Sequence, residues 1–363
     1  MKRIVCFHLL NDYSGSPKVL KTILEWLLEK GWQIDLTTSK DGPLTQLKQS
    51  RQLRFHSYSY HFSDNPIVTL LRYSLVQIYT FFLAFKWLFS KNTVFYINTL
   101  LPLGPALAGR IMNKNVIYHY HENAFVKGRF YKILAYCMQR LANKIICVSN
   151  YQASFLNNKN KFIVIPNSLP PDFTKDFVHN PDIAFNNKTI LMLSSLKEYK
   201  GTKQFIELSQ QLPQYSFILV INDNQDNIDN YIKRNFQKLN KSNLKIYARQ
   251  DSVTEFYRQS SVLLNLSDKH QIIETFGMTI LEALSFGLPS IVPTEGGPAE
   301  LITDGVNGFK TDVQHLDKIK QQIKLLLSNK EVYSTMSRNA LDTATQFNTV
   351  NTMKRIETIF REQ

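Results

Sequence analysis

The sequence predicts an α/β protein made of two domains, each with a parallel β-sheet. Apolar strand-like runs alternate with helical patterns along the chain, which is the order that parallel sheets with helical crossovers require. The alternation is interrupted at 166–172, where three prolines stop both strand and helix. With 363 residues and 44% hydrophobic content, the chain can bury two cores.

The first domain, residues 1–170, opens with a strand. The run 3–10 is apolar, and we interpret it as a strand and not as a secretory signal because His8 interrupts it and no small-residue cleavage site follows. A helical pattern over 17–30 begins with a proline and ends at Gly31. Further strands are expected at 32–38, 93–98, 116–121, 144–149 and 162–165.

The second domain, residues 171–347, restarts with an apolar run at Thr189. Two helical stretches, 315–329 and 331–346, close it, and a last helix over 350–361 lies in a separate segment, 348–363. Strands, each followed by a helical pattern, are expected at 216–221, 244–247, 262–266 and 290–293.

Residues 67–89 form the longest apolar stretch. Arg72, Gln77 and Lys86 interrupt it, so it lacks the roughly 20 apolar residues in a row that a membrane-spanning helix needs. The pattern predicts a large amphipathic helix of the first domain. The alternative is a helix lying on a membrane surface, because Phe and Trp crowd its C-terminal half beside Lys86 and Lys91.

Charge is distributed unevenly between the two halves. Residues 1–170 hold 21 Lys and Arg against 7 Asp and Glu, whereas 171–363 hold 22 of each, so the whole formal charge of +14 lies in the first half. Such a domain attracts phosphate-bearing lipids, nucleic acid or acidic glycans, and an ordinary solvated surface of a lysine-rich protein is the alternative. Nucleic acid is the weakest of these partners, because no nucleic-acid motif or basic run of five is present. The three cysteines have no ligand spacing, which is typical of reduced thiols in a cytoplasmic protein.

The most informative motif is ETFGMTILEAL, residues 274–284, which places Glu274 and Glu282 eight positions apart. On a helix rising about 1.5 Å per residue they would stand roughly 12 Å apart, too far to flank one glycosidic bond, which needs about 5–9.5 Å. With Thr275 as N-cap, the helix would offer backbone N–H groups near Gly277 to an anion. Two carboxylates holding hydroxyls at the ends of one ligand, with a phosphate between them, match the shape of a nucleotide-sugar.

A second motif follows at 287–309, GLPSIVPTEGGPAELITDGVNGF. It places Gly296 and Gly297 between a short buried strand and a helix opened by Pro298. A glycine pair at that place lets the backbone approach a ligand at the carboxyl end of a parallel sheet.

These two segments resemble the donor site of retaining glycosyltransferases of family 4. The resemblance implies the GT-B fold, two Rossmann-like domains with parallel sheets facing across a cleft. Residues 1–170 would then bind the acceptor, 171–347 the donor, and the helix of 348–363 would cross back onto the first domain. Further matching segments are VIYHYHE (116–122), CVSNYQASFL (147–156), VIPNS (164–168) and TILMLSSLKEYKGTKQFIEL (189–208).

The resemblance implies roles for residues of the second domain. Glu274 would contact the transferred sugar and Glu282 the ribose hydroxyls, where a charge-assisted bond orients a hydroxyl strongly. Lys200 would neutralise the departing diphosphate. A carboxylate on a solvated helix face and a surface lysine at a helix start are the structural alternatives. Backbone N–H groups for the distal phosphate would come from Phe276, Gly277 and Met278.

In the first domain, His121 resembles the family's cleft histidine and would complete the catalytic set with Glu274 and Lys200; a buried structural histidine is the alternative. Gly15 belongs to a loop after the first strand where the family often has two glycines, and its contact with the donor stays open. A basic patch beyond His121 either meets a phosphorylated acceptor or is an ordinary helix face. Its cations are Lys127, Arg129 and Lys132.

One position departs from the family pattern. The family usually has Gly-Arg at the end of the first strand of its second domain, and that arginine binds phosphate. This chain has Ser194 and Ser195 there, so the bidentate cation is lost. Lys197 would compensate as a donor ligand.

The chain is therefore expected to be a retaining, hexosyltransferase-type glycosyltransferase that moves a sugar from a nucleotide-sugar donor to an anionic or lipid-linked saccharide in surface polysaccharide or lipopolysaccharide-type synthesis. No cofactor and no metal are expected, since an Asp-x-Asp motif is absent from the sequence. The expected location is cytoplasmic, with peripheral contact to the inner membrane surface left open. Because of Ser195, a GT-B pseudoenzyme that binds nucleotide-sugar as a scaffold or regulatory subunit is the alternative, and a sugar-nucleotide epimerase is a third hypothesis.

Overall fold

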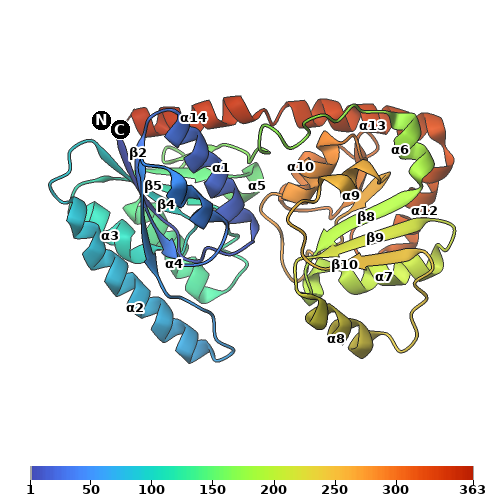
Figure 1. Cartoon of the computed structure of the whole chain (residues 1–363), viewed down its shortest axis with the longest axis horizontal. Coiled ribbons are helices and arrows are strands. Elements are labelled where there is room, and N and C mark those ends of the chain that lie inside the picture. The colour runs from blue at the N-terminus through green and yellow to red at the C-terminus, as the bar shows by residue number, and fades with distance from the viewer. Residues whose placement is uncertain (1, 363) are drawn as a thin grey trace. The chain divides into compact units, whose positions relative to one another are not determined.

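The computed structural model describes residues 2–362 and divides the chain into two compact units (Figure 1). Unit 1 comprises the chain up to Ser168 together with the segment from Val350 onward, and unit 2 comprises Leu169–Thr349. Each unit contains one parallel β-sheet covered by helices, so the predicted fold class of two Rossmann-like α/β domains is confirmed.

Unit 1 is built on a seven-stranded sheet in the order β3-β2-β1-β4-β5-β6-β7, with every neighbouring pair parallel. Its middle strands are buried on both faces, which explains why they are continuous apolar runs in the sequence. The strands are β1 (Arg3–Phe7), β2 (Gln33–Ser39), β3 (Leu53–Tyr58), β4 (Thr93–Asn98), β5 (Asn115–Tyr120), β6 (Lys144–Cys147) and β7 (Phe162–Val164). The helices are α1 (Gly15–Glu29), η1 (Pro43–Gln49), α2 (Pro66–Ala84), η2 (Phe85–Trp87), α3 (Leu103–Ile111), α4 (Arg129–Leu141), α5 (Asn150–Ala153) and α14 (Thr349–Arg361).

Two features of unit 1 differ from the sequence-based prediction. Strand β3 was not predicted, because Arg54, His56 and Ser57 interrupt it and it lacks a continuous apolar run. Strand β1 ends at Phe7 and not at residue 10, and the residues after it lead into α1.

The long apolar stretch forms α2, whose N-cap Asn65 accepts a hydrogen bond from the backbone N–H of Ile67 at 2.9 Å. This helix, continued by η2, is long and apolar enough by composition to cross a membrane, and only 22% of its most apolar window is buried. It packs against α3 (Figure 1), where a Cβ on Gly104 would lie 2.1 Å from the carbonyl oxygen of Gln77. It is thus a helix of unit 1. Its outward face is apolar, whereas an ordinary amphipathic helix has a polar outward face.

The last helix, α14, belongs to unit 1 and lies beside α1 (Figure 1). The carboxylate of Glu357 accepts hydrogen bonds from the indole N–H groups of Trp26 at 3.3 Å and Trp32 at 3.2 Å. The apolar residues Met353, Ile356, Ile359 and Phe360 on the same helix are buried.

Unit 2 contains a six-stranded parallel sheet in the order β10-β9-β8-β11-β12-β13. Strand β13, three residues at the sheet edge, was not predicted, because its sequence GFK has no apolar run. The strands are β8 (Thr189–Ser194), β9 (Ser216–Ile221), β10 (Leu244–Tyr247), β11 (Val262–Leu264), β12 (Ser290–Val292) and β13 (Gly308–Lys310).

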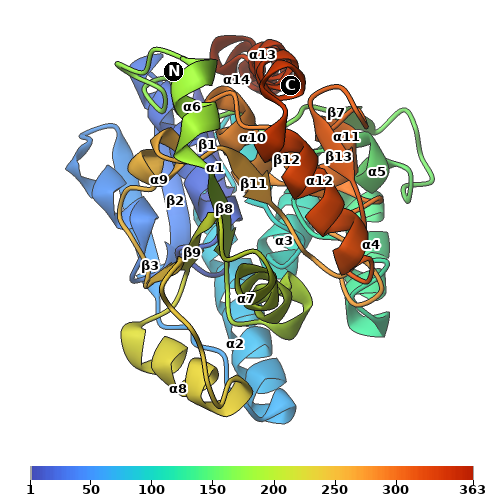
Figure 2. The same ribbon diagram turned by 90° about the vertical axis from the view of Figure 1, so that its right-hand side faces the viewer.

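The helices of unit 2 cover both faces of its sheet, and α12 packs against α7 and α13 (Figure 2). They are α6 (Pro181–Asn187), η3 (Glu198–Lys200), α7 (Thr202–Gln211), α8 (Gln225–Asn235), α9 (Thr254–Arg258), α10 (Met278–Ser285), α11 (Gly297–Leu301), α12 (Leu316–Ser328) and α13 (Lys330–Thr345).

The strand order reverses direction once in each sheet, between β1 and β4 in unit 1 and between β8 and β11 in unit 2. In open α/β sheets the loops leaving the carboxyl ends of the two strands at such a point separate and form a crevice that binds ligands. A ligand-binding site of unit 2 is therefore expected at the loops after β8 and β11.

Candidate functional site

Two loops of unit 2 meet at the carboxyl edge of its sheet. Lys200 ends η3, directly after β8, and Asn265 and Ser267 follow β11. Glu274 lies further along the β11 loop, in front of α10. Because β8 and β11 are neighbours in the sheet, residues 74 positions apart in the sequence come into contact.

Glu274 is held by three side chains. The Lys200 ammonium donates a hydrogen bond to Glu274 Oε1 and forms an ion pair with it. Ser267 Oγ donates to the same oxygen at 2.6 Å, and Asn265 Nδ2 donates to Oε2 at 3.4 Å. The side chains of Lys200 and Glu274 remain 28% and 18% exposed, so a ligand can still reach both.

The pair keeps both groups charged. Burial by itself would raise the pKa of Glu274, but the Lys200 ammonium and the two neutral donors outweigh it and hold that pKa below its usual value. Burial likewise opposes the charge on Lys200, and Glu274 raises the pKa of that ammonium above its usual value. The site therefore presents a fixed carboxylate and a fixed cation side by side at neutral pH.

The helix behind Glu274 begins later than predicted. Gly277 is the N-cap, with φ +112°, and α10 starts at Met278, so Thr275 is not the N-cap as we had expected. A Cβ at Gly277 would lie 2.8 Å from Ile280 Cδ1, and a φ of this sign favours glycine. The first N–H groups of α10 lack partners within the helix and lie at its positive end, which is where an anion binds favourably.

The side chains on either side of Gly277 differ in burial. Phe276 is buried and its ring lies 6.0 Å from that of Phe347. Met278 is half-buried. The part of either residue that could contact a phosphate is its backbone N–H.

The glycine pair before α11 supports the segment that carries Glu274. The backbone N–H of Gly297 donates to the carbonyl oxygen of Glu274 at 2.9 Å. A Cβ on Gly297 would lie 2.2 Å from the carbonyl oxygen of Thr275 and 2.3 Å from Phe276 Cα. The predicted close approach at this glycine is thus made by the protein's own backbone.

Glu282 lies one turn into α10 and is half-buried. The hydroxyl of Tyr257, a fully buried residue of α9, donates to Glu282 Oε2 at 2.5 Å. Burial and the neighbouring carboxylate raise the pKa of Tyr257 well above its usual value, so its hydroxyl remains a donor. Glu282 is therefore held by a buried neighbour and does not simply lie on a solvated helix face.

The position of the missing arginine is occupied by a small hydrogen-bonded turn. The carbonyl oxygen of Ser195 accepts from Thr202 Oγ1 at 3.0 Å, and Ser194 Oγ lies 2.9 Å from the same hydroxyl. Lys197 is exposed, and its ammonium lies 5.9 Å from the ring centroid of Tyr199. Lys200 is the cation that the fold places against Glu274.

In unit 1, His121 lies just past the end of β5, in a cluster of polar side chains at the β1/β4 reversal point. Its Nε2–H donates to Asn98 Oδ1 at 3.1 Å, and Asn98 Nδ2 donates to His8 Nδ1 at 3.1 Å. The ring centroid of His121 is 4.2 Å from that of His119, which is buried and forms a hydrogen bond with the hydroxyl of Tyr96.

The histidines of this cluster are neutral at physiological pH. Burial lowers the pKa of His119 to about 3 and that of His8 to about 4. Burial, together with the two neighbouring imidazoles, lowers the pKa of His121 well below its usual value. His121 can therefore serve as a neutral hydrogen-bond group, and the charged imidazolium is strongly disfavoured there.

The other predicted residues of unit 1 are exposed. Gly15 is the first residue of α1 and not part of the preceding loop, and a Cβ on it would meet nothing within 4 Å. Lys127 lies in the loop before α4, with its ammonium 5.3 Å from the ring of Tyr131. Arg129 and Lys132 lie in the first turn of α4.

Sequence reasoning missed the residues that hold the site residues in place, namely Asn265, Ser267, Tyr257 and Asn98. A signal exists for three of them. Asn265 and Ser267 directly follow a buried apolar strand, and Asn98 ends one. Tyr257 has no such signal, because it lies in a short helix and contacts Glu282 only in the folded chain.

Among residues 2–362, no group of three or more His, Cys, Asp or Glu side chains is arranged to hold a metal ion. Unit 1 has a pocket of about 590 Å³, and none of the predicted site residues lines it.

The two units correspond to known domain families. Residues 175–343 match the model described as Glycosyl transferases group 1, and residues 13–173 match the model described as Glycosyltransferase Family 4. One half of the chain is thus similar to group 1 glycosyltransferase domains and the other half to family 4 domains. The residues Lys200, Glu274 and Glu282 all lie within the group 1 domain.

Curated relatives match parts of this chain. An uncharacterised glycosyltransferase of Methanocaldococcus jannaschii is 28% identical over 244 residues, which cover 65% of this chain and 64% of that protein. N-acetyl-alpha-D-glucosaminyl L-malate synthase of Bacillus anthracis is 32% identical over 113 residues, 31% of this chain and 29% of that one. The chain thus spans less than two thirds of the length of these relatives.

Solved structures share the whole fold. Anabaena HepE in complex with UDP and glucose aligns over 100% of both chains with a TM-score of 0.80 at 20% identity. Sucrose-phosphate synthase from Thermosynechococcus elongatus aligns over 100% of this chain and 99% of its own with a TM-score of 0.76 at 15% identity. At such identities the likeness establishes the GT-B type of fold and no more.

Proposed function

We propose that the protein transfers a hexose from a nucleotide-sugar to a hydroxyl of a saccharide or lipid-linked acceptor, with retention of anomeric configuration, as a family 4 enzyme. Unit 2 binds the donor. Lys200 and the N-terminus of α10 face its diphosphate, Glu274 its sugar and Glu282 its ribose hydroxyls.

The observation that carries this proposal is the contact between Lys200 and Glu274 at the carboxyl edge of the sheet. A cation and a carboxylate that are charged, partly exposed and adjacent to a helix N-terminus match the phosphate and the hydroxyls of one ligand. The complexes of HepE with UDP and with UDP-glucose, in a protein of the same fold, agree with this choice of ligand.

The proposed reaction breaks the bond between the anomeric carbon and the distal phosphate oxygen, and the acceptor oxygen forms the new bond on the same face of the sugar. The acceptor's proton passes to the leaving diphosphate, whose charge Lys200 stabilises. Neutral His121 is proposed to hydrogen-bond near the transferred sugar. No metal and no cofactor enter this scheme.

The finer assignments are also proposals. The acceptor is an anionic or lipid-linked saccharide of a surface polysaccharide or lipopolysaccharide-type pathway, and Lys127, Arg129 and Lys132 contact it. Reaction at the cytoplasmic face of the membrane is supported by the basic charge of the first half of the chain. Gly15 and Lys197 are proposed to lie against the donor.

A panel of UDP- and GDP-sugars tests the proposal. We expect one donor to be turned over by the wild type and turnover to fall about a hundredfold or more in Glu274→Gln, as loss of a group that acts on the transition state produces. Glu255→Gln, at an exposed glutamate of α9 paired with Arg258, is the matched control. Equal turnover by Glu274→Gln and Glu255→Gln would refute the role of Glu274.

A pseudoenzyme that binds nucleotide-sugar without transferring it is the second candidate, and Ser195 favours it because the usual phosphate arginine is absent. Isothermal calorimetry separates the two. Donor binding that is weakened by Lys200→Gln, together with no transfer or hydrolysis for any donor, would support the pseudoenzyme.

A further inference from the structure

The outward face of α2 is apolar over most of its length. Its large apolar side chains recur at helical spacing and are about half exposed or more, and Arg72 is the only charged residue of the helix. These side chains are Ile67, Leu70, Leu71, Leu75, Ile78, Tyr79 and Phe82. A soluble surface helix normally carries polar residues on this face.

The opposite face of α2 fixes the helix to unit 1. Tyr73 is buried and its hydroxyl donates to the carbonyl oxygen of Leu101 at 2.8 Å. Gln77 Oε1 accepts from the backbone N–H of Gly104 at 2.8 Å, at the tight contact with α3. Because these polar contacts attach α2 to the domain, the helix lies along the domain surface. Its apolar side remains exposed.

The apolar surface continues across two neighbouring helices. Helix α3 packs against both α2 and α4. We call the exposed apolar side chains of these three helices the α2–α4 face. Besides those of α2 it contains Leu107, Ile111, Phe130, Ile133 and Tyr136. Contiguous exposed apolar surface of this kind marks an interaction site.

The charge around this face is mostly positive, and the exposed Asp64 lies just before the N-cap of α2. Residues 65–171, which include all three helices, hold 12 Lys and Arg but a single acidic residue, Glu122. The Glu122 carboxylate is turned inward, since it accepts the backbone N–H groups of Leu100 at 3.0 Å and His121 at 3.3 Å. Cations on the exposed parts of α2, α4 and the loops are therefore not balanced by neighbouring carboxylates.

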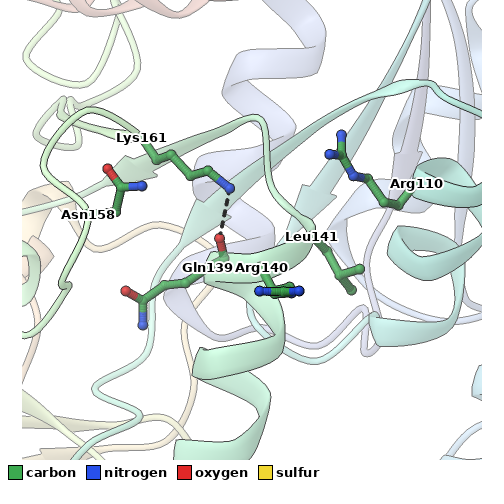
Figure 3. A pocket seen from close by; sticks show the side chains of 6 residues that line it. All are labelled: Arg110, Gln139, Arg140, Leu141, Asn158 and Lys161. Atoms are coloured by element: carbon green, nitrogen blue, oxygen red, sulfur yellow. Dashed lines mark hydrogen bonds between the residues drawn. The ribbon is translucent and has the colours of Figure 1, made fainter.

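A basic hollow lies at the C-terminal ends of α3 and α4 (Figure 3). Arg110, Arg140 and Lys161 line it, and the lining contains no carboxylate. Lys161 Nζ donates to the carbonyl oxygen of Gln139 at 3.1 Å, which leaves its charge unneutralised. Arg110 is adjacent in sequence to Ile111 of the α2–α4 face, so cations border the apolar surface.

We propose that the α2–α4 face docks on an anionic lipid bilayer. Helix α2 lies parallel to the membrane with its apolar side chains among the acyl chains, and the bordering cations, including those of the basic hollow, bind lipid phosphates. An apolar face with bordering cations and exposed aromatic residues is complementary to a negatively charged interface. A second copy of this chain would place the same excess of positive charge opposite this face, whereas an anionic bilayer supplies the opposite charge.

This docking is independent of the donor site, so it is tested with the full chain and without any sugar nucleotide. The probe is co-sedimentation with vesicles of phosphatidylcholine alone or with about 30% phosphatidylglycerol, at low ionic strength. We expect binding to the anionic vesicles and at least tenfold weaker binding to the neutral ones. No binding to anionic vesicles, or equal binding to both, would overturn the proposal.

Matched variants separate the apolar contribution from the charge. Leu71→Glu is compared with Ile183→Glu, since both residues are 60% exposed and Ile183 lies on α6 of unit 2. The double variant Arg110→Gln/Arg140→Gln is compared with Lys233→Gln/Arg234→Gln on α8 of unit 2. We expect the first of each pair to weaken vesicle binding about tenfold and the second to leave it unchanged.

Circular dichroism melts verify that each variant is folded before binding is compared. If Leu71→Glu and Ile183→Glu bind vesicles equally, the α2–α4 face is not the docking surface. Light scattering of the lipid-free protein tests the competing occupant. A dimer that Leu71→Glu dissociates would assign the face to a second copy and overturn the proposal.

Discussion

Two carboxylates of unit 2 are held by partners of different chemistry. Glu274 is paired with a cation and two neutral donors, whereas Glu282 is bonded to the hydroxyl of a buried tyrosine. The first arrangement keeps a charged group available next to a second charge. The second fixes the direction of a carboxylate on a helix, because a buried tyrosine has little freedom to move away.

Tyr257→Phe tests this positioning. Removing the hydroxyl takes one hydrogen-bond donor away from Glu282. Because a hydrogen bond to a charged group contributes about 1.5–3 kcal/mol, we expect UDP affinity to fall about tenfold. Isothermal calorimetry with UDP measures it. Tyr333→Phe is the control, since Tyr333 is equally buried in unit 2 and donates to the carbonyl oxygen of Ser261. An unchanged affinity in Tyr257→Phe would show that Glu282 needs no support.

At the scale of elements, α14 is attached to unit 1 by its buried apolar residues and by one carboxylate. Glu357 accepts from two tryptophans on or near α1 and pairs with Arg361 one turn later. Burial would raise the pKa of Glu357, but Arg361 and the indole N–H groups outweigh it and lower that pKa below 4.5.

The sign of the pH dependence follows from this lowered pKa. The stabilisation is present above about 4.5, the value for the unfolded chain, and is lost as the pH falls through the lower folded-state pKa. Glu357→Gln should therefore lower the free energy of unfolding by about 1–3 kcal/mol at pH 7, and the difference from wild type should shrink below pH 4.5. Urea unfolding at a series of pH values measures both quantities.

Glu29→Gln, at an exposed glutamate of α1, is the control for the loss of one charge. If the two variants lose the same free energy at pH 7, or if the loss for Glu357→Gln grows on acidification, the network with the tryptophans does not secure α14.

At the scale of the whole molecule, charge and apolar surface are concentrated in the same unit. The formal charge of +14 lies within residues 1–170, and the most exposed apolar helix, α2, is in that half as well. This combination makes the proposed membrane contact partly electrostatic and partly hydrophobic, and the two parts respond differently to salt.

Raising the ionic strength separates them. Charge interactions are screened within about 10 Å at 0.1 M salt and about 3 Å at 1 M, so we expect binding to anionic vesicles to fall about tenfold or more over that range. The remaining binding should be abolished in Leu71→Glu, which leaves the cations in place. Co-sedimentation in a salt series measures the effect, and binding that is insensitive to salt would contradict an electrostatic contribution.

Much of the architecture follows from the sequence by itself. The alternation of strands and helices, the division near residue 168 and the donor motif at 274–284 all depend on local patterns. Two edge strands, β3 and β13, were missed, because neither contains a continuous apolar run. Local patterns also placed the start of α10 two residues or more too early, since the N-cap is set by the positive φ of Gly277 and not by the capping ability of Thr275.

Only the tertiary structure decided which side chains meet. Lys200 and Glu274, 74 positions apart, meet because the parallel sheet brings the loops after β8 and β11 to one edge. Tyr257 on α9 reaches Glu282 on α10 because the two helices lie close together in the folded chain. The burial of one face of α2 and the exposure of the other were likewise hidden, since periodicity cannot tell which apolar side chains will be covered. Local sequence patterns were enough to predict the fold class and the two candidate carboxylates of the site. Long-range packing decides which side chains hold these carboxylates and which apolar face remains exposed.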